Sequence, residues 1–99
     1  MNKIVYILNI NNLPHLLFEN DKMKYFDVDN NKSLKVINDY LLNKINFNSM
    51  TISNEKELIY NNEKYSITIL ELIGVDNIKD NSSIRGFMNL DYNEFSYLD

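Results

Sequence analysis

Residues 30–47 carry the longest helical repeat of apolar side chains in the chain, and this repeat limits the fold more than any other feature. An α-helix turns by about 100° per residue, so apolar residues spaced three and four apart form one stripe that faces a core. The stripe consists of Leu34, Ile37, Leu41 and Ile45. Polar residues at the start of the stretch can cap its first turn, and Asn46 suits the left-handed conformation that ends many helices. We therefore expect one main α-helix over about residues 31–46.

Three further apolar side chains, Val36, Tyr40 and Phe47, lie on nearly the opposite side of this helix. A surface helix normally has one apolar stripe, so a helix with two is covered on both sides. The second side can contact a neighbouring loop, or it can form a patch for a partner protein. Val36 and Tyr40 are therefore candidate binding residues.

Short runs rich in β-branched and aromatic residues flank this helix on both sides, and they predict a small sheet. The runs cover residues 4–8, 16–19, 23–29, 50–52, 58–60, 65–73 and 84–90. The first run is apolar throughout, which indicates a central strand that is buried on both faces. Turn residues predict that the second run pairs with the third, and the fifth with the sixth, as hairpins. The polar stretch 74–83 is expected to be a mobile loop.

The predicted fold class is α+β: a small mixed β-sheet with one main α-helix and a short C-terminal helix. Asp91 and Glu94 have the spacing of a capping box at the start of that second helix. The chain has 99 residues, which is enough for one modest core but not for two. We therefore expect a single domain over residues 1–99.

Acidic residues gather in the second half of the chain, whose overall net charge is -4. Residues 1–48 carry six basic and five acidic residues, whereas residues 49–99 carry four basic and nine acidic residues. A nucleic-acid-binding protein should show a basic stripe, so direct nucleic-acid binding is not expected. Such acidity favours solubility, and it also suits a face that binds a basic partner. The candidate residues of this face are Glu55, Glu57, Asp76, Asp80, Asp91 and Glu94.

The chain has no cysteine and only one histidine, His15. Disulfides and thiolate metal sites are therefore excluded, and we expect no metal site and no cofactor. His15 is expected to have a structural role beside a turn rather than to bind a ligand or act in catalysis. The N-terminal apolar run is too short for a signal peptide or a membrane span, so a cytoplasmic protein without membrane attachment is expected.

The order of these elements resembles that of the Nudix domain: a strand, a hairpin, one helix, a strand pair, and a final strand that turns into a helix. The Nudix signature, GX5EX7REUXEEXGU with U apolar, places metal-binding carboxylates on the helix. When DYLLNKINF is laid on REUXEEXGU, Leu41 and Phe47 keep the apolar positions. Tyr40, Asn43 and Lys44 then replace the glutamates. Because Mg²⁺ binds through hard oxygen ligands, the resemblance implies the Nudix fold without pyrophosphate hydrolysis.

These observations lead to three hypotheses for the function. The leading one is a small non-catalytic binding protein that inhibits or regulates a macromolecular partner, of the kind phages use against host defence, such as anti-CRISPR proteins. Its partner would be a protein, for example a basic nucleic-acid-handling machine. The alternative is a catalytically inactive Nudix-like module that senses a nucleotide by stacking it on aromatic residues such as Tyr25 and Phe87. The third hypothesis is an active Nudix hydrolase.

A homodimer is a further expectation. In the family that the chain resembles, another helix follows the final turn and covers one face of the sheet, whereas this sequence stops soon after Glu94. A face without that helix would expose Tyr65, Ile67 and Ile69. Because a large apolar patch usually marks an interface, a second copy or a partner is expected to cover it, and a symmetric homodimer is the simplest such assembly.

Overall fold

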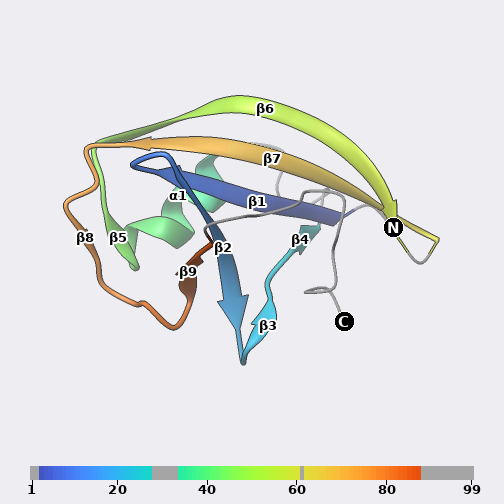
Figure 1. Cartoon of the computed structure of the whole chain (residues 1–99), viewed down its shortest axis with the longest axis horizontal. Helices are drawn as coiled ribbons and strands as arrows, with labels where there is room; N and C mark the ends of the chain where they lie inside the picture. Colours follow the sequence, from blue (N-terminus) through green and yellow to red (C-terminus); the bar gives the residue numbers. More distant parts are fainter. Residues whose placement is uncertain (1–2, 28–33, 61, 88–99) are drawn as a thin grey trace.

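A computed structural model describes residues 3–27, 34–60 and 62–87, and within these ranges it is a mixed α/β structure with many strands and one helix (Figure 1). The elements in chain order are β1 (Lys3–Ile10), β2 (Leu13–Glu19), β3 (Lys22–Met23), β4 (Phe26–Asp27), α1 (Leu34–Leu42), β5 (Ile45–Asn46), β6 (Ser49–Tyr60), β7 (Glu63–Ile73), β8 (Asn77–Ile78) and β9 (Ile84–Gly86).

The main sheet is mixed because its two central strands, β1 and β7, run parallel, whereas its other strand pairs are antiparallel. Its order is β3-β2-β1-β7-β6, with β4 also paired to β1 and β9 to β2. One edge of β1 is shared, since β2 pairs with its second half and β4 with its first residues. A separate small sheet joins β5 and β8. The predicted mixed sheet with β1 at its centre is confirmed.

Asparagine-rich turns explain why successive strands pair directly. Asn11 and Asn12, between β1 and β2, have φ values of 52° and 66°. Asn20 and Asp21, between β2 and β3, have φ values of 54° and 61°. Two left-handed residues in a row are typical of type I′ turns, whose twist matches that of hairpin strands, and Asn and Asp tolerate this conformation. The predicted pairing of β2 with β3 and of β6 with β7 is confirmed.

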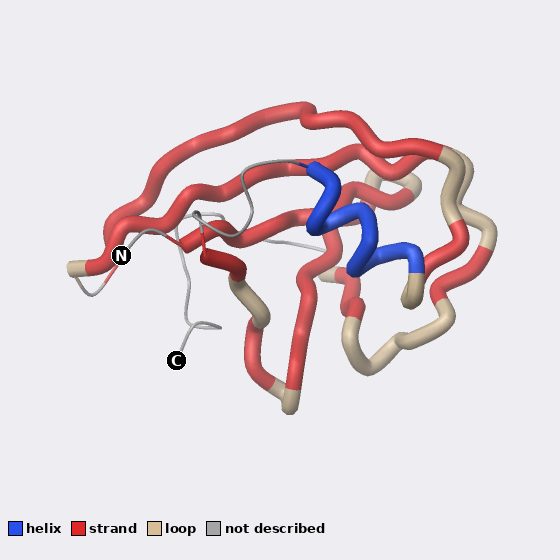
Figure 2. Tube along the Cα trace, turned by 180° about the vertical axis from the view of Figure 1, so that it is seen from behind, coloured by secondary structure: helices blue, strands red, loops and turns tan. Residues whose placement is uncertain are grey.

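Buried apolar side chains lie on both faces of the main sheet, because successive residues of a strand point to opposite faces. The cluster on the face covered by α1 (Figure 2) consists of Tyr6, Leu8, Ile10, Leu17, Ile37, Leu41, Ile45, Leu70, Leu72 and Ile84. The cluster on the opposite face consists of Val5, Ile7, Leu16, Phe18, Met23, Tyr65, Ile67 and Ile69. β1 and β7 contribute to both clusters, and this explains why their sequences are apolar almost without interruption.

The main helix is shorter than predicted, since α1 ends at Leu42 rather than near residue 46. The backbone N–H of Lys44 donates to the carbonyl of Leu41 at 2.9 Å and closes the last turn. Ile45 and Asn46 then pair with β8. The helical spacing of Ile45 is therefore coincidental: its side chain reaches the same core from a strand.

Several other predicted boundaries need correction. The runs 50–52 and 58–60 are parts of one strand, β6, because β7 pairs with it along its length. The stretch 23–29 contains two short strands, β3 and β4, instead of one. The expected loop 74–83 contains β8, and the N–H of Lys79 donates to the Lys44 carbonyl at 2.7 Å. The predicted C-terminal helix, with Asp91 and Glu94, lies outside the described residues.

The face that was expected to be exposed is buried. Tyr65, Ile67 and Ile69 have exposed fractions of 5%, 0% and 6%. The exposed-face argument for a homodimer is therefore wrong, and these three residues give no reason to expect a second copy.

Candidate functional site

β6 is the longest edge strand in the described part of the main sheet. β6 has twelve residues, and in that part of the chain it pairs only with β7. In Figures 1 and 2 it forms the outer border of the sheet. An edge strand presents a row of backbone N–H and C=O groups that another strand can pair with. β6 is therefore a candidate docking edge.

A β-bulge in β6 brings its exposed apolar and acidic residues onto one side. The register shifts between Ile52 and Asn54, so that Ile52 is opposite Leu70 and Glu55 is opposite Thr68. Residues at alternate positions share a face, so Glu57 and Ile59 lie on the same side as Glu55. Without the extra residue, Ile52 would point to the other face. Bulges of this kind also bend the strand.

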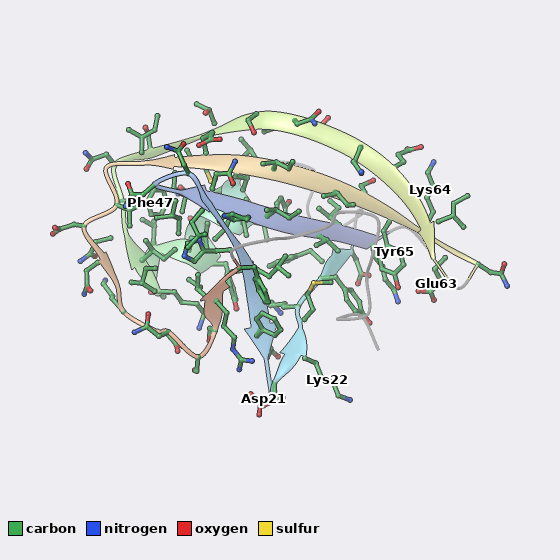
Figure 3. All side chains as sticks on the ribbon, in the orientation of Figure 1. Asp21, Lys22, Phe47, Glu63, Lys64 and Tyr65 are labelled. Carbon is green, nitrogen blue, oxygen red and sulfur yellow. The ribbon has the colours of Figure 1, made fainter. Side chains whose placement is uncertain are left out.

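This side of β6 combines two apolar side chains with two carboxylates. Ile52 and Ile59 are 45% and 74% exposed. Glu57 forms an ion pair with Lys64 at 3.1 Å (Lys64 is labelled in Figure 3). Within the described ranges, the Glu55 carboxylate forms no ion pair, and its charge contributes to the raised pKa of Tyr6. Glu55 is therefore available to an incoming cation.

The charge pattern of β6 disfavours antiparallel pairing with a second copy of itself in the registers centred on Lys56 or Glu57. Antiparallel pairing centred on Lys56 would place Glu55 of one copy opposite Glu57 of the other, and Lys56 opposite Lys56. Pairing centred on Glu57 would place two glutamates opposite each other. Like charges in directly opposed positions destabilise a strand pair, whereas opposite charges stabilise it. The edge is suited to a positively charged strand instead.

Two of the predicted acidic residues lie in the segment between β7 and β9, away from this edge. Asp76 is exposed, and its backbone N–H donates to the Asn46 carbonyl at 3.0 Å. Asp80 accepts hydrogen bonds from the hydroxyls of Ser82 and Ser83, both at 2.7 Å. These hydrogen bonds, with a further one from Lys44, hold the pKa of Asp80 well below its ordinary value. Asp80 is thus part of a turn and not a free binding group.

Replacing Asp80 by Ala should open this turn. The carboxylate also accepts from the backbone N–H of Ser82 at 3.2 Å and of Ser83 at 3.3 Å, and Ala offers no acceptor. Amide hydrogen exchange should therefore accelerate at residues 82–84 while exchange in the central strands is unchanged. Asp76→Ala is the matched control, because no hydrogen bond joins the Asp76 side chain to another described residue. Equal exchange in both variants would show that the Asp80 carboxylate does not hold the turn.

The predicted aromatic candidates lie in separate contacts. Tyr25 packs edge-on against Tyr65 with ring centroids 6.5 Å apart, and the ammonium of Lys3 lies 4.4 Å from the centre of the Tyr25 ring. Phe87 packs against Phe18 with centroids 6.1 Å apart. Tyr25 and Phe87 therefore contact different rings of the same cluster on the face opposite α1, and neither lines a pocket found in the described residues.

On the second side of α1, other side chains cover Tyr40, whereas Val36 is exposed to solvent. Tyr40 packs edge-on against Phe26 with centroids 5.6 Å apart, and the Lys44 ammonium lies 5.2 Å from its ring centre. Burial is the main reason that the pKa of Tyr40 is raised. Val36 is 40% exposed. The interpretation of Tyr40 as a contact with a neighbouring segment thus fits its environment, whereas Val36 remains at the surface.

The sequence did not single out Ile52 and Ile59 as candidate residues. The bulge that places them beside the glutamates depends on pairing with β7, and no local pattern reveals it. The only local signal was the alternation of charge from Glu55 to Glu57. A charged alternating run is typical of an edge strand, so it could have pointed to this site.

Among residues 3–27, 34–60 and 62–87, no group of three or more His, Asp or Glu side chains is placed to hold a metal ion. The helix in these ranges is too short to cross a membrane. Comparison with known protein families, with curated proteins and with solved structures found no match to this chain.

Proposed function

We propose that this chain is a small non-catalytic binding protein that inhibits or regulates a macromolecular partner by pairing a basic extended segment of that partner with β6. The observation that carries the proposal is the open twelve-residue edge with two apolar and two acidic side chains on one side. In β-strand addition, main-chain hydrogen bonds provide affinity and alternate side chains provide specificity.

Each part of the edge has a distinct role in this proposal. The backbone of β6 pairs with the partner strand. Glu55 and Glu57 attract Lys or Arg side chains and raise the rate of association. Ile52 and Ile59 provide apolar contacts toward the two ends of the edge. The same glutamates repel acidic strands, so the edge selects against acidic partner segments.

The contacts of the Lys44 ammonium group support a non-catalytic role for the protein. When the helix sequence is aligned with the Nudix signature, Lys44 lies at a position where that family has a glutamate. Its ammonium lies 3.4 Å from the Asp80 carboxylate and packs over the Tyr40 ring. A cation fixed here repels a divalent metal, which pyrophosphate chemistry needs to stabilise negative charge on the phosphate oxygens.

A synthetic peptide of alternating Lys and Thr tests the proposal, with the corresponding Glu and Thr peptide as control. Fluorescence anisotropy should show binding of the basic peptide only, and amide shifts in NMR spectra should follow β6. The double variant Glu55→Gln and Glu57→Gln should weaken binding about tenfold, because two complementary charges are lost. Asp27→Gln with Asp39→Gln removes the same total charge elsewhere and should have little effect.

A second peptide separates strand pairing from simple charge attraction. N-methylation of alternate residues removes backbone donors but keeps the charges, so the methylated basic peptide should lose binding if β6 pairs with it. Equal binding of both basic peptides would contradict strand pairing. If the two double variants weaken peptide binding equally, the peptide responds to the overall charge of the protein and not to the edge of β6.

A further inference from the structure

A pocket of about 470 Å³ lies where the two parallel strands end. Its lining includes Ile10 and Asn11, at the end of β1, and Val75 and Asp76, just after β7. In open sheets, ligands commonly bind outside the carboxyl ends of parallel strands, where the connecting segments separate. The volume is within the range of small-molecule sites.

A buried histidine provides one wall of this pocket. His15 is only 8% exposed, and its Nδ1 lies 2.8 Å from the Leu13 carbonyl oxygen. A carbonyl can only accept, so Nδ1 carries the proton and donates. In the neutral ring the other nitrogen, Nε2, is an acceptor, and no described residue donates to it. A buried acceptor without a protein partner is a reason to expect a donor from a ligand or water.

Gly86 allows this ring position. His15 is opposite Gly86 in the pairing of β2 with β9. A Cβ at residue 86 would lie 3.1 Å from Nε2 of His15 and 3.0 Å from a methyl group of Leu13. Both distances are tighter than ordinary van der Waals contacts, so a larger residue would require the imidazole and the Leu13 methyl group to shift slightly.

The rest of the lining carries one carboxylate and three side-chain amides, and it has no cationic side chain. Asp76 contributes a carboxylate, and Asn11, Asn77 and Asn81 contribute side-chain amides, each of which has an acceptor oxygen. No hydrogen bond occupies these four side chains within the part of the chain that is described. Apolar surface comes from Ile10, Leu13, Val75 and Ile78.

We propose that this pocket binds a small organic cation, a guanidinium or primary ammonium group on a short apolar body. The charged group would donate to the Asp76 carboxylate and to Nε2 of His15, while the apolar body contacts Leu13 and Ile78. An anion or a phosphate finds no cationic side chain here. A hard metal ion finds only one carboxylate, fewer than such ions usually require.

The test uses n-butylguanidinium, with n-butylurea as its uncharged counterpart. An NMR titration should show saturable shifts for the guanidinium at Asn11, Asp76 and Asn77, with much weaker binding of the urea. The ¹⁵N signal of His15 Nε2 should move as this nitrogen accepts a hydrogen bond. Asp76→Asn should weaken guanidinium binding at least fivefold and leave urea binding unchanged.

Asp39→Asn is the matched control, because Asp39 is an exposed acid on α1 that pairs with Lys35. It should leave guanidinium binding unchanged, as should the neutralised β6 variant. Equal weakening by Asp39→Asn and Asp76→Asn would overturn the proposal, because the cation would then respond only to net charge. Equal affinity for the urea, or an unchanged Nε2 signal, would also overturn it. These outcomes concern only the pocket and not peptide binding at β6. Failure of one proposal can therefore be distinguished from failure of the other.

Discussion

Replacing Leu70 by Ala should lower the free energy of unfolding by about 2–5 kcal/mol, the range for deletion of a large buried aliphatic side chain. Leu70 has no exposed surface, and it packs in the cluster between the sheet and α1. It also lies in the middle of β7, between β1 and β6, so neither neighbouring strand can move in without losing its register. Urea denaturation monitored by circular dichroism measures this loss.

Ile73→Ala is the matched control on the same strand. Ile73 is 52% exposed, so its truncation removes little buried surface and leaves no cavity. Its effect should be no more than about 1 kcal/mol. Similar losses in the two variants would mean that the face toward α1 is not a tightly packed core.

The protein should lose about 2–3 kcal/mol of stability between about pH 10 and pH 12 because of one buried phenol. Burial, assisted by the charge of Glu55, raises the pKa of Tyr6 to about 12. In the unfolded chain, Tyr6 ionises near its ordinary value of 10.0, whereas in the folded protein it stays neutral to higher pH. The contribution is therefore complete below about pH 10 and is lost as the pH rises through the folded pKa.

Denaturation curves across this pH range, for the wild-type protein and Tyr6→Phe, measure the contribution. The variant should lose less stability than the wild type as the pH rises, whatever its stability at neutral pH. The pKa values of Tyr40 and Tyr65 are also raised, mainly by burial, so some alkaline sensitivity should remain. The same pH dependence in both proteins would show that Tyr6 ionises normally in the fold.

Features with local causes could be read from the sequence. The run from Ile4 to Leu8 identified the central strand, because a strand buried on both faces must be apolar throughout. Asn20 and Asp21 marked a hairpin, because they tolerate the left-handed conformation of its turn. Ile37 and Leu41 identified the buried side of the helix by their spacing alone. These signals do not depend on distant parts of the chain.

Features that depend on distant partners could not be read in this way. Ile45 continued the helical spacing, but pairing with Ile78 places it in β5. The bulge at Ile52 follows from the register with β7. Asp80 looked like a free surface acid, yet neighbouring hydroxyls and a lysine more than thirty residues away hold its carboxylate. The sequence therefore predicted the acidic residues of the candidate site, Glu55 and Glu57. It did not predict that a bulge on an edge strand places them beside Ile52 and Ile59.

The parallel pairing of β1 with β7 also has a consequence for how the chain folds during synthesis. β1 is complete at Ile10, but its parallel partner begins only at Glu63, so the two strands meet after a long intervening segment has been made. Contacts between such distant residues slow folding, because the chain loses much conformational freedom before they form. Until β7 leaves the ribosome, one edge of a strongly apolar strand has no native partner. During this interval the free edge of β1 is therefore prone to pair with other chains.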